Sequence, residues 1–118
     1  LEVMGLSLYV EPVSRLNSVV GINLPEGLAT KPLLAYMSKH YRVEISGSFG
    51  ADIVRIGQMG EQCRSHNIFR ALHALGASMK ALGVSVDLPA GVAALEASLE
   101  SFQYSATLSK ACQLAAID

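Results

Sequence analysis

Hydrophobic residues recur at helical spacing in two segments of the second half of the chain. The clearer one predicts a helix over about 65–82, with hydrophobic residues at steps of four and three and Gly83 suited to the position just after a helix. Its stripe consists of Ile68, Leu72, Leu75, Met79 and Leu82. A second stripe, Val92, Leu95, Leu99 and Phe102, follows Leu88-Pro89-Ala90-Gly91, and residues 108–116 are weaker but compatible with a helix.

The first half of the chain has the pattern of short strands separated by turns. β-prone runs predict strands at 7–10, 19–24, 43–46 and 53–57. Between the second and the third, hydrophobic residues at helical spacing predict a helix that ends near Tyr41, with Thr30 as its N-cap. Residues 47–50 are predicted to form a tight loop, and the first residues resemble the frayed end of a helix.

This order of elements predicts an α+β fold. Short strands with few residues between them favour antiparallel pairing, and helices on one face of a small sheet give two layers. We therefore expect one two-layer domain over 1–87, with a small antiparallel sheet covered by helices. Residues 88–118 are expected to form a helical C-terminal extension that packs on the same domain or on a partner subunit.

Composition narrows the class of protein. The chain has 118 residues, of which 51% are hydrophobic and only 16% charged, with a formal net charge of −1. So few charges suggest faces that another domain or subunit covers. Near-neutral charge argues against a nucleic-acid-binding surface, and no run is long enough to span a membrane. Cys63 and His66 form half of a zinc motif without a second half, so we expect no metal site.

Arg55 is the candidate for chemistry. On a strand it would share a face with Ile53 and Gly57, partly desolvated and with open space beside it. A guanidinium in that setting suits a planar carboxylate held by two parallel hydrogen bonds. A pairing with an acidic side chain, or extension into water, is the alternative that spacing alone favours. The loop of Gly47, Ser48, Phe49 and Gly50 would let the backbone approach a small ligand.

An ordered series of motifs carries a resemblance to a known family. Leu24-Pro25-Glu26-Gly27, a helix, Val43-Glu44-Ile45-Ser46-Gly47-Ser48-Phe49-Gly50, and then Arg55-Ile56-Gly57-Gln58-Met59-Gly60 before a long helix resemble the C-terminal small domain of class V aminotransferases. These enzymes depend on pyridoxal 5'-phosphate (PLP), and the resemblance is greatest to the alanine–glyoxylate and serine–pyruvate branch. It implies that Arg55 binds the substrate carboxylate. Ser48 departs from the pattern, which has a second glycine there.

The resemblance also implies the wider setting of the chain. It implies a transaminase that moves an amino group from alanine, serine or a similar amine to a 2-oxo acid such as glyoxylate or pyruvate. PLP would be bound mainly by a large domain that precedes this chain and carries the Schiff-base lysine, and the assembly would be a cytoplasmic homodimer or higher homo-oligomer. The alternative is a free-standing α+β interaction or oligomerisation domain without catalysis.

Overall fold

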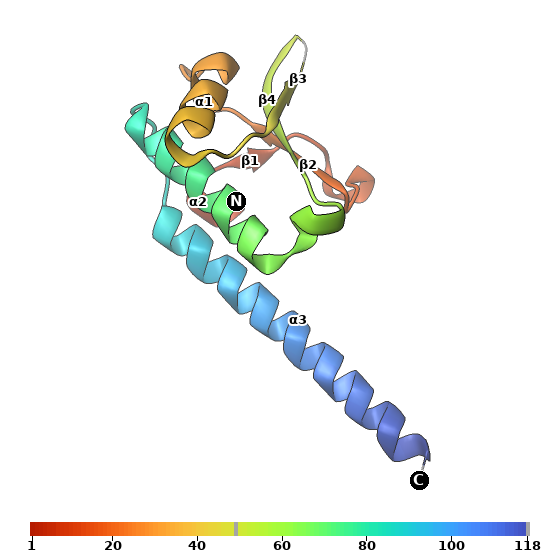
Figure 1. The fold of residues 1–118 in the computed structure, drawn as a ribbon. Helices are drawn as coiled ribbons and strands as arrows, with labels where there is room; N and C mark the ends of the chain where they lie inside the picture. The colour runs from red at the N-terminus through yellow and green to blue at the C-terminus, as the bar shows by residue number, and fades with distance from the viewer. Residues whose placement is uncertain (49, 118) are drawn as a thin grey trace.

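The computed structural model describes the backbone of residues 1–48 and 50–117, and side chains in that range up to Phe102. It contains an antiparallel sheet of four strands (Figure 1). The strands are β1 (Ser7–Leu8), β2 (Val19–Asn23), β3 (Ser46–Ser48) and β4 (Ala51–Gly57). The helices are α1 (Thr30–Tyr36), the π-turn η3 (Met37–Tyr41) that continues it, α2 (Ser65–Ala81) and α3 (Leu88–Ile117). Three short 3-10 turns complete the chain: η1 (Glu2–Met4), η2 (Pro12–Ser14) and η4 (Gly60–Cys63).

β4 lies between β2 and β3 in the strand order β1-β2-β4-β3. All three pairings are antiparallel, with Ile22 of β2 opposite Val54 of β4 and Ser46 of β3 opposite Arg55. The sheet and its covering helices confirm the predicted α+β class. In the described part of the chain, no helix is long and apolar enough to cross a membrane.

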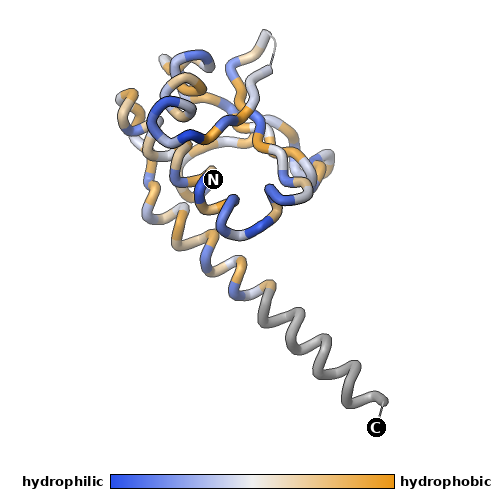
Figure 2. The backbone as a smooth tube through the Cα atoms, viewed as in Figure 1, coloured by the Kyte–Doolittle hydropathy of each residue, from blue (hydrophilic) through white to orange (hydrophobic). Residues whose placement is uncertain are grey.

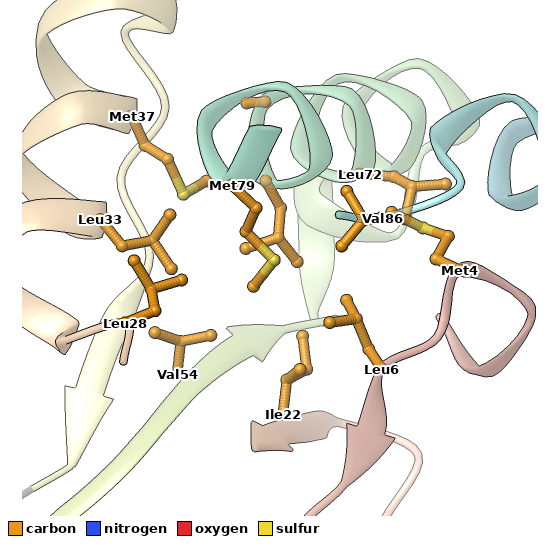
Figure 3. Packing of buried hydrophobic residues seen from close by; sticks show 12 residues of the cluster. Met4, Leu6, Ile22, Leu28, Leu33, Met37, Val54, Leu72, Met79 and Val86 are labelled. Atoms are coloured by element: carbon orange, nitrogen blue, oxygen red, sulfur yellow. The ribbon is translucent and has the colours of Figure 1, made fainter. Parts of the chain in front are cut away.

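The hydrophobic core lies between this sheet and the helices α1 and α2 (Figure 3). Ile22 and Val54 face it from neighbouring strands and have no exposed surface. The largest side chains opposite them, with no exposed surface either, are Leu33, Met37, Leu75 and Met79. Burial of one such side chain contributes about 1.5–3 kcal/mol, so this layer of contacts fixes the sheet on the helices.

The predicted stripe of α2 is confirmed. Leu72, Leu75 and Met79 are buried, and the helix ends within one residue of the expected position. Gly83 follows with a φ of 90°, and the N–H of Val84 donates to the Met79 carbonyl at 2.9 Å. This left-handed glycine closes the helix by satisfying carbonyls that its last turn leaves free. Figure 2 shows how hydrophobic and hydrophilic residues mix along α2 and the first turns of α3.

Two local predictions are wrong, and a third is confirmed with longer bounds. The strand expected over 43–46 begins only at Ser46, because Arg42 turns the backbone with a φ of 52° and the next three residues run outside the ladder. Thr30 does not cap α1: it is the first helical residue, and Ala29 occupies the cap position. The predicted helical tail is confirmed, and its two helical patterns form one continuous helix, α3.

The start of α3 is fixed against α2 and η1. The Asp87 carboxylate accepts a hydrogen bond from the N–H of Ala90 at 3.1 Å and so caps the helix. A Cβ built on Gly91 would overlap Met4, and one built on Gly76 of α2 would lie 2.7 Å from Leu88. The two glycines let α3 approach closely before it extends away from the rest of the domain (Figure 1).

Candidate carboxylate-binding site

Arg55 lies near the end of β4, where the sheet loses its cover. Ile53 and Val54 are both buried, whereas Arg55 and Gly57 are exposed. Both faces of the strand are therefore covered in its middle, and the face that carries Arg55 and Gly57 is exposed near its end. The sequence predicted a partly desolvated guanidinium, whereas Arg55 is exposed in the structure.

The guanidinium of Arg55 binds a backbone carbonyl. Its Nε and Nη2 atoms donate to the Gly47 oxygen at 3.1 and 2.8 Å. Neither alternative raised by the sequence, an acidic partner or simple extension into water, describes this contact. An arginine has five N–H donors, and the N–H groups of Nε and Nη2 that bind Gly47 are two of them. We call these two the side-on pair. The end-on pair, one N–H from each terminal nitrogen, has no protein partner among the described residues.

The candidate loop is shorter than expected. Gly47 and Ser48 belong to β3, and the ladder shifts register between them. Gly50 forms the turn with a φ of 72°. Ser48 and Gly50 line a shallow hollow of about 510 Å³ beside the start of α1. Phe49, the remaining residue of the predicted loop, lies outside the described residues.

A cleft of about 1110 Å³ opens where residues 43–45 separate from β4. Arg55 and the end of β4 form one wall, and residues of α2 and α3 form the others. Three arginines, Arg42, Arg55 and Arg70, but one carboxylate, Glu44, line it in the described part of the chain. The cleft is thus positively charged in a chain with a formal net charge of −1.

Sequence reasoning missed Arg42 and Arg70. The Nη2 atom of Arg70 donates to the carbonyls of Tyr41 and Arg42, at 3.3 and 3.2 Å. Arg70 thereby holds the end of the π-turn next to the cleft. The local sequence gave no signal of this contact, because it joins residues nearly thirty positions apart.

None of the lysines whose side chains are described lies in a setting that suits a Schiff base. Lys31, Lys39 and Lys80 are exposed and lie outside the cleft, and the side chain of Lys110 is not among those described. A lysine that forms a Schiff base is normally desolvated, so these three do not fit PLP. No cluster of three metal-ligating side chains occurs in the described part of the chain. The Cys63 thiol donates to the Gln58 carbonyl at 2.8 Å.

Large hydrophobic side chains are exposed in the segment that joins β1 to β2 and on the first residue of β2. Tyr9, Val10 and Val19 are more than a third exposed, Leu16 is 70% exposed and Val13 is 94% exposed. We call these five residues the hairpin patch. Several such side chains together on one segment are typical of a surface that another domain or subunit covers.

Comparison with known proteins indicates one class, the aminotransferases. No family model matches the chain. The mouse alanine–glyoxylate aminotransferase is 32% identical over 79 residues, which are 64% of this chain and 19% of the mouse protein. The (S)-ureidoglycine–glyoxylate transaminase of Bacillus subtilis is 29% identical over 106 residues, 87% of this chain and 25% of that enzyme.

Solved structures give the same result. The crystal structure of the Bacillus subtilis ureidoglycine–glyoxylate aminotransferase superimposes with a TM-score of 0.80 at 26% identity, over 84% of this chain and 26% of that one. Pyridoxamine–pyruvate aminotransferase from Mesorhizobium loti has a TM-score of 0.80 at 27% identity, over 85% of this chain and 26% of its own.

The predicted resemblance is confirmed. The chain is homologous to part of the aminotransferases, and its fold is consistent with the C-terminal domain of a class V aminotransferase. More particularly, its homologues are the alanine–glyoxylate and ureidoglycine–glyoxylate enzymes. The chain spans about a fifth to a quarter of the length of these relatives.

Proposed function

We propose that this chain is the C-terminal small domain of a PLP-dependent aminotransferase that transfers an amino group from a small amine donor to a short 2-oxo acid. The names of the three similar enzymes all contain glyoxylate or pyruvate, whereas the donors in them differ. Alanine, serine or a similar amine is the donor we expect here. The carboxylate of a short 2-oxo acid is its permanent charge, so a site for it needs a cation that matches a carboxylate.

Arg55 is the residue we propose for that contact. One observation carries the proposal. Gly47 accepts hydrogen bonds from the side-on pair of Arg55, whereas the end-on pair has no partner among the described residues, and Arg55 lines the cleft. A carboxylate bound there would receive two parallel N–H···O bonds. Gly47 contributes a neutral oxygen, so the positive charge of Arg55 stays available to an anion.

PLP would be held mainly by the large domain that we propose precedes this chain. When bound, it would supply an electron sink for the reaction. The residues of this chain would act on the substrate alone: Arg55 would orient it through its carboxylate, and the walls of the cleft would limit its movement. The hairpin patch supports a covering domain or a partner subunit, and a cytoplasmic homodimer or higher homo-oligomer is the assembly we propose.

We also propose the domain boundaries inferred from the sequence, with 1–87 as the small domain and 88–118 as an extension. The capped start of α3 and its glycine contacts with η1 and α2 support packing of the extension on the same domain.

The test uses the full-length protein that ends in this sequence, with Arg55→Ala and Arg55→Lys. Loss of hydrogen bonds to a charged group costs about 1.5–3 kcal/mol, so Arg55→Ala should raise the KM for glyoxylate or pyruvate by about 10- to 150-fold. Arg55→Lys keeps the charge but loses the planar fork, and its KM should lie between those of the wild type and the alanine variant.

Arg64→Ala is the control. Arg64 is also exposed, but it pairs with Glu61 at 2.7 Å and lies outside both the cleft and the hairpin patch. Its KM should equal that of the wild type. A folded Arg55→Ala enzyme with an unchanged KM for the 2-oxo acid would show that the carboxylate binds elsewhere.

A further inference from the structure

We infer that Gly47 is a positioning residue for Arg55, and that the methyl group of Thr30 in turn fixes Gly47. The inference rests on the proposed function of Arg55 and extends it to two residues that would not touch the substrate. Three elements meet at this point: α1 supplies Thr30, β3 supplies Gly47 and β4 supplies Arg55.

The first step is the orientation of the guanidinium. An exposed arginine on a strand has many side-chain rotamers of similar energy. Two hydrogen bonds to one oxygen, from Nε and Nη2, restrict Arg55 to the rotamers that keep its side-on edge on Gly47. The end-on edge then points in a fixed direction. A carboxylate binds more tightly to such a guanidinium because less conformational freedom is lost on binding.

The second step is the position of the Gly47 carbonyl. A Cβ built on Gly47 would lie 2.8 Å from Cγ2 of Thr30 and 3.6 Å from Cδ1 of Leu34. The first distance is shorter than real side chains allow. β3 can therefore lie this close to α1 only with a glycine at position 47. The backbone conformation there is not left-handed, so the requirement comes from the close approach alone.

The third step is the side chain of Thr30. Threonine is β-branched and has few allowed rotamers in a helix, so its methyl group cannot move away freely. Its hydroxyl oxygen is buried without a hydrogen-bond partner in the described part of the chain, and the residue does not cap α1. The atom of Thr30 that a side chain at position 47 would meet first is the carbon of its methyl group.

A side chain at position 47 should therefore move the strand and its carbonyl. Arg55 would follow the carbonyl or lose it, and the end-on edge would no longer meet the carboxylate squarely. The effect should appear in the affinity for the 2-oxo acid, and much less in the steps that follow once the substrate is bound.

The experiment measures KM and kcat for glyoxylate in the full-length enzyme, with melting temperature as a check of folding. Gly47→Ala should raise KM about tenfold, the effect of weakening one hydrogen bond to a charged group, with kcat changed less than about twofold. Adding Thr30→Ala should restore KM to within about threefold, because the methyl group that meets the new Cβ is gone. Adding Thr30→Val instead should not restore it, because valine keeps a methyl group at that place.

Different failures have different meanings. If folded Gly47→Ala has a normal KM while Arg55→Ala raises it, the positioning role is wrong and the proposed function stands. If Arg55→Ala has a normal KM, the proposed function itself fails. Equal rescue by Thr30→Ala and Thr30→Val would overturn the role of the methyl group. Should Gly47→Ala not fold, the double variant with Thr30→Ala decides: it should fold with a near-normal KM, and a folded protein with a KM as high as that of Arg55→Ala would refute the inference.

Discussion

Substitution of Gly91 by alanine tests whether α3 belongs to the folded domain. The added Cβ would overlap both Sδ and Cγ of Met4, atoms in the middle of a side chain that is 98% buried. Overpacking of this kind costs about 1–3 kcal/mol, and because two central atoms are involved we expect the upper half of that range. Alanine in place of glycine favours the helix by about 1 kcal/mol. The free energy of unfolding should therefore fall by about 1–2 kcal/mol.

The free energy is measured by urea unfolding of the chain, followed by circular dichroism. In a thermal scan, the melting temperature should fall by roughly 5 °C. Ala93→Gly is the control, because Ala93 is exposed in the same turn of α3 and reports helix propensity alone. Met4→Ala should relieve the clash, so in that background Gly91→Ala should become stabilising. If Gly91→Ala alone stabilises the chain by about 1 kcal/mol, the propensity gain is unopposed, and α3 is not held against Met4 as described.

Three further predictions concern the core and the chain as a whole. Leu75→Ala should lower the free energy of unfolding by about 2–5 kcal/mol, because Leu75 has no exposed surface. Leu82 is only half-buried, so Leu82→Ala should lower it by less than half as much. Equal decreases in the urea midpoints of the two variants would contradict the core described. Ser78→Ala should raise the free energy of unfolding by about 1 kcal/mol, because the buried Ser78 oxygen has no partner among the described residues. A lower melting temperature would show that this hydroxyl does make a hydrogen bond. The isolated chain, mixed with PLP, alanine and glyoxylate, should show no turnover, whereas turnover would place the lysine within it. The interaction-domain alternative instead predicts a native polypeptide no longer than this chain, monodisperse as an oligomer, with a melting temperature that 2-oxo acids do not change.

The parts of the fold that depend on local pattern could be predicted from the sequence. The stripe of α2 specified the helix, because each of its buried residues repeats at helical spacing and Gly83 ends it. Alternation placed Ile53, Arg55 and Gly57 on one face of their strand, which leaves Val54 on the opposite face, where the structure has it in the core. These signals lie within one element, so no knowledge of distant residues was needed.

The parts that depend on distant contacts could not be predicted. Residues 43–45 have strand composition, but the turn at Arg42 directs them away from β4. Arg42 carries no sign of this turn, since a left-handed conformation is uncommon outside glycine and asparagine. The partner of Arg55 was missed for a similar reason: a backbone carbonyl has no side-chain signature, so the sequence suggested acidic groups instead.

The choice of partner determines what Arg55 can do. An acidic side chain would have neutralised the guanidinium and occupied the edge that a carboxylate needs. A backbone carbonyl fixes the same guanidinium and leaves its charge intact, in a cleft where arginines outnumber the single described glutamate. The carbonyl belongs to a strand that a glycine brings against α1, so the orientation of Arg55 depends on the packing of the domain. In the function proposed above, the small domain would bring a rigid, charged group to an active site whose cofactor other residues hold.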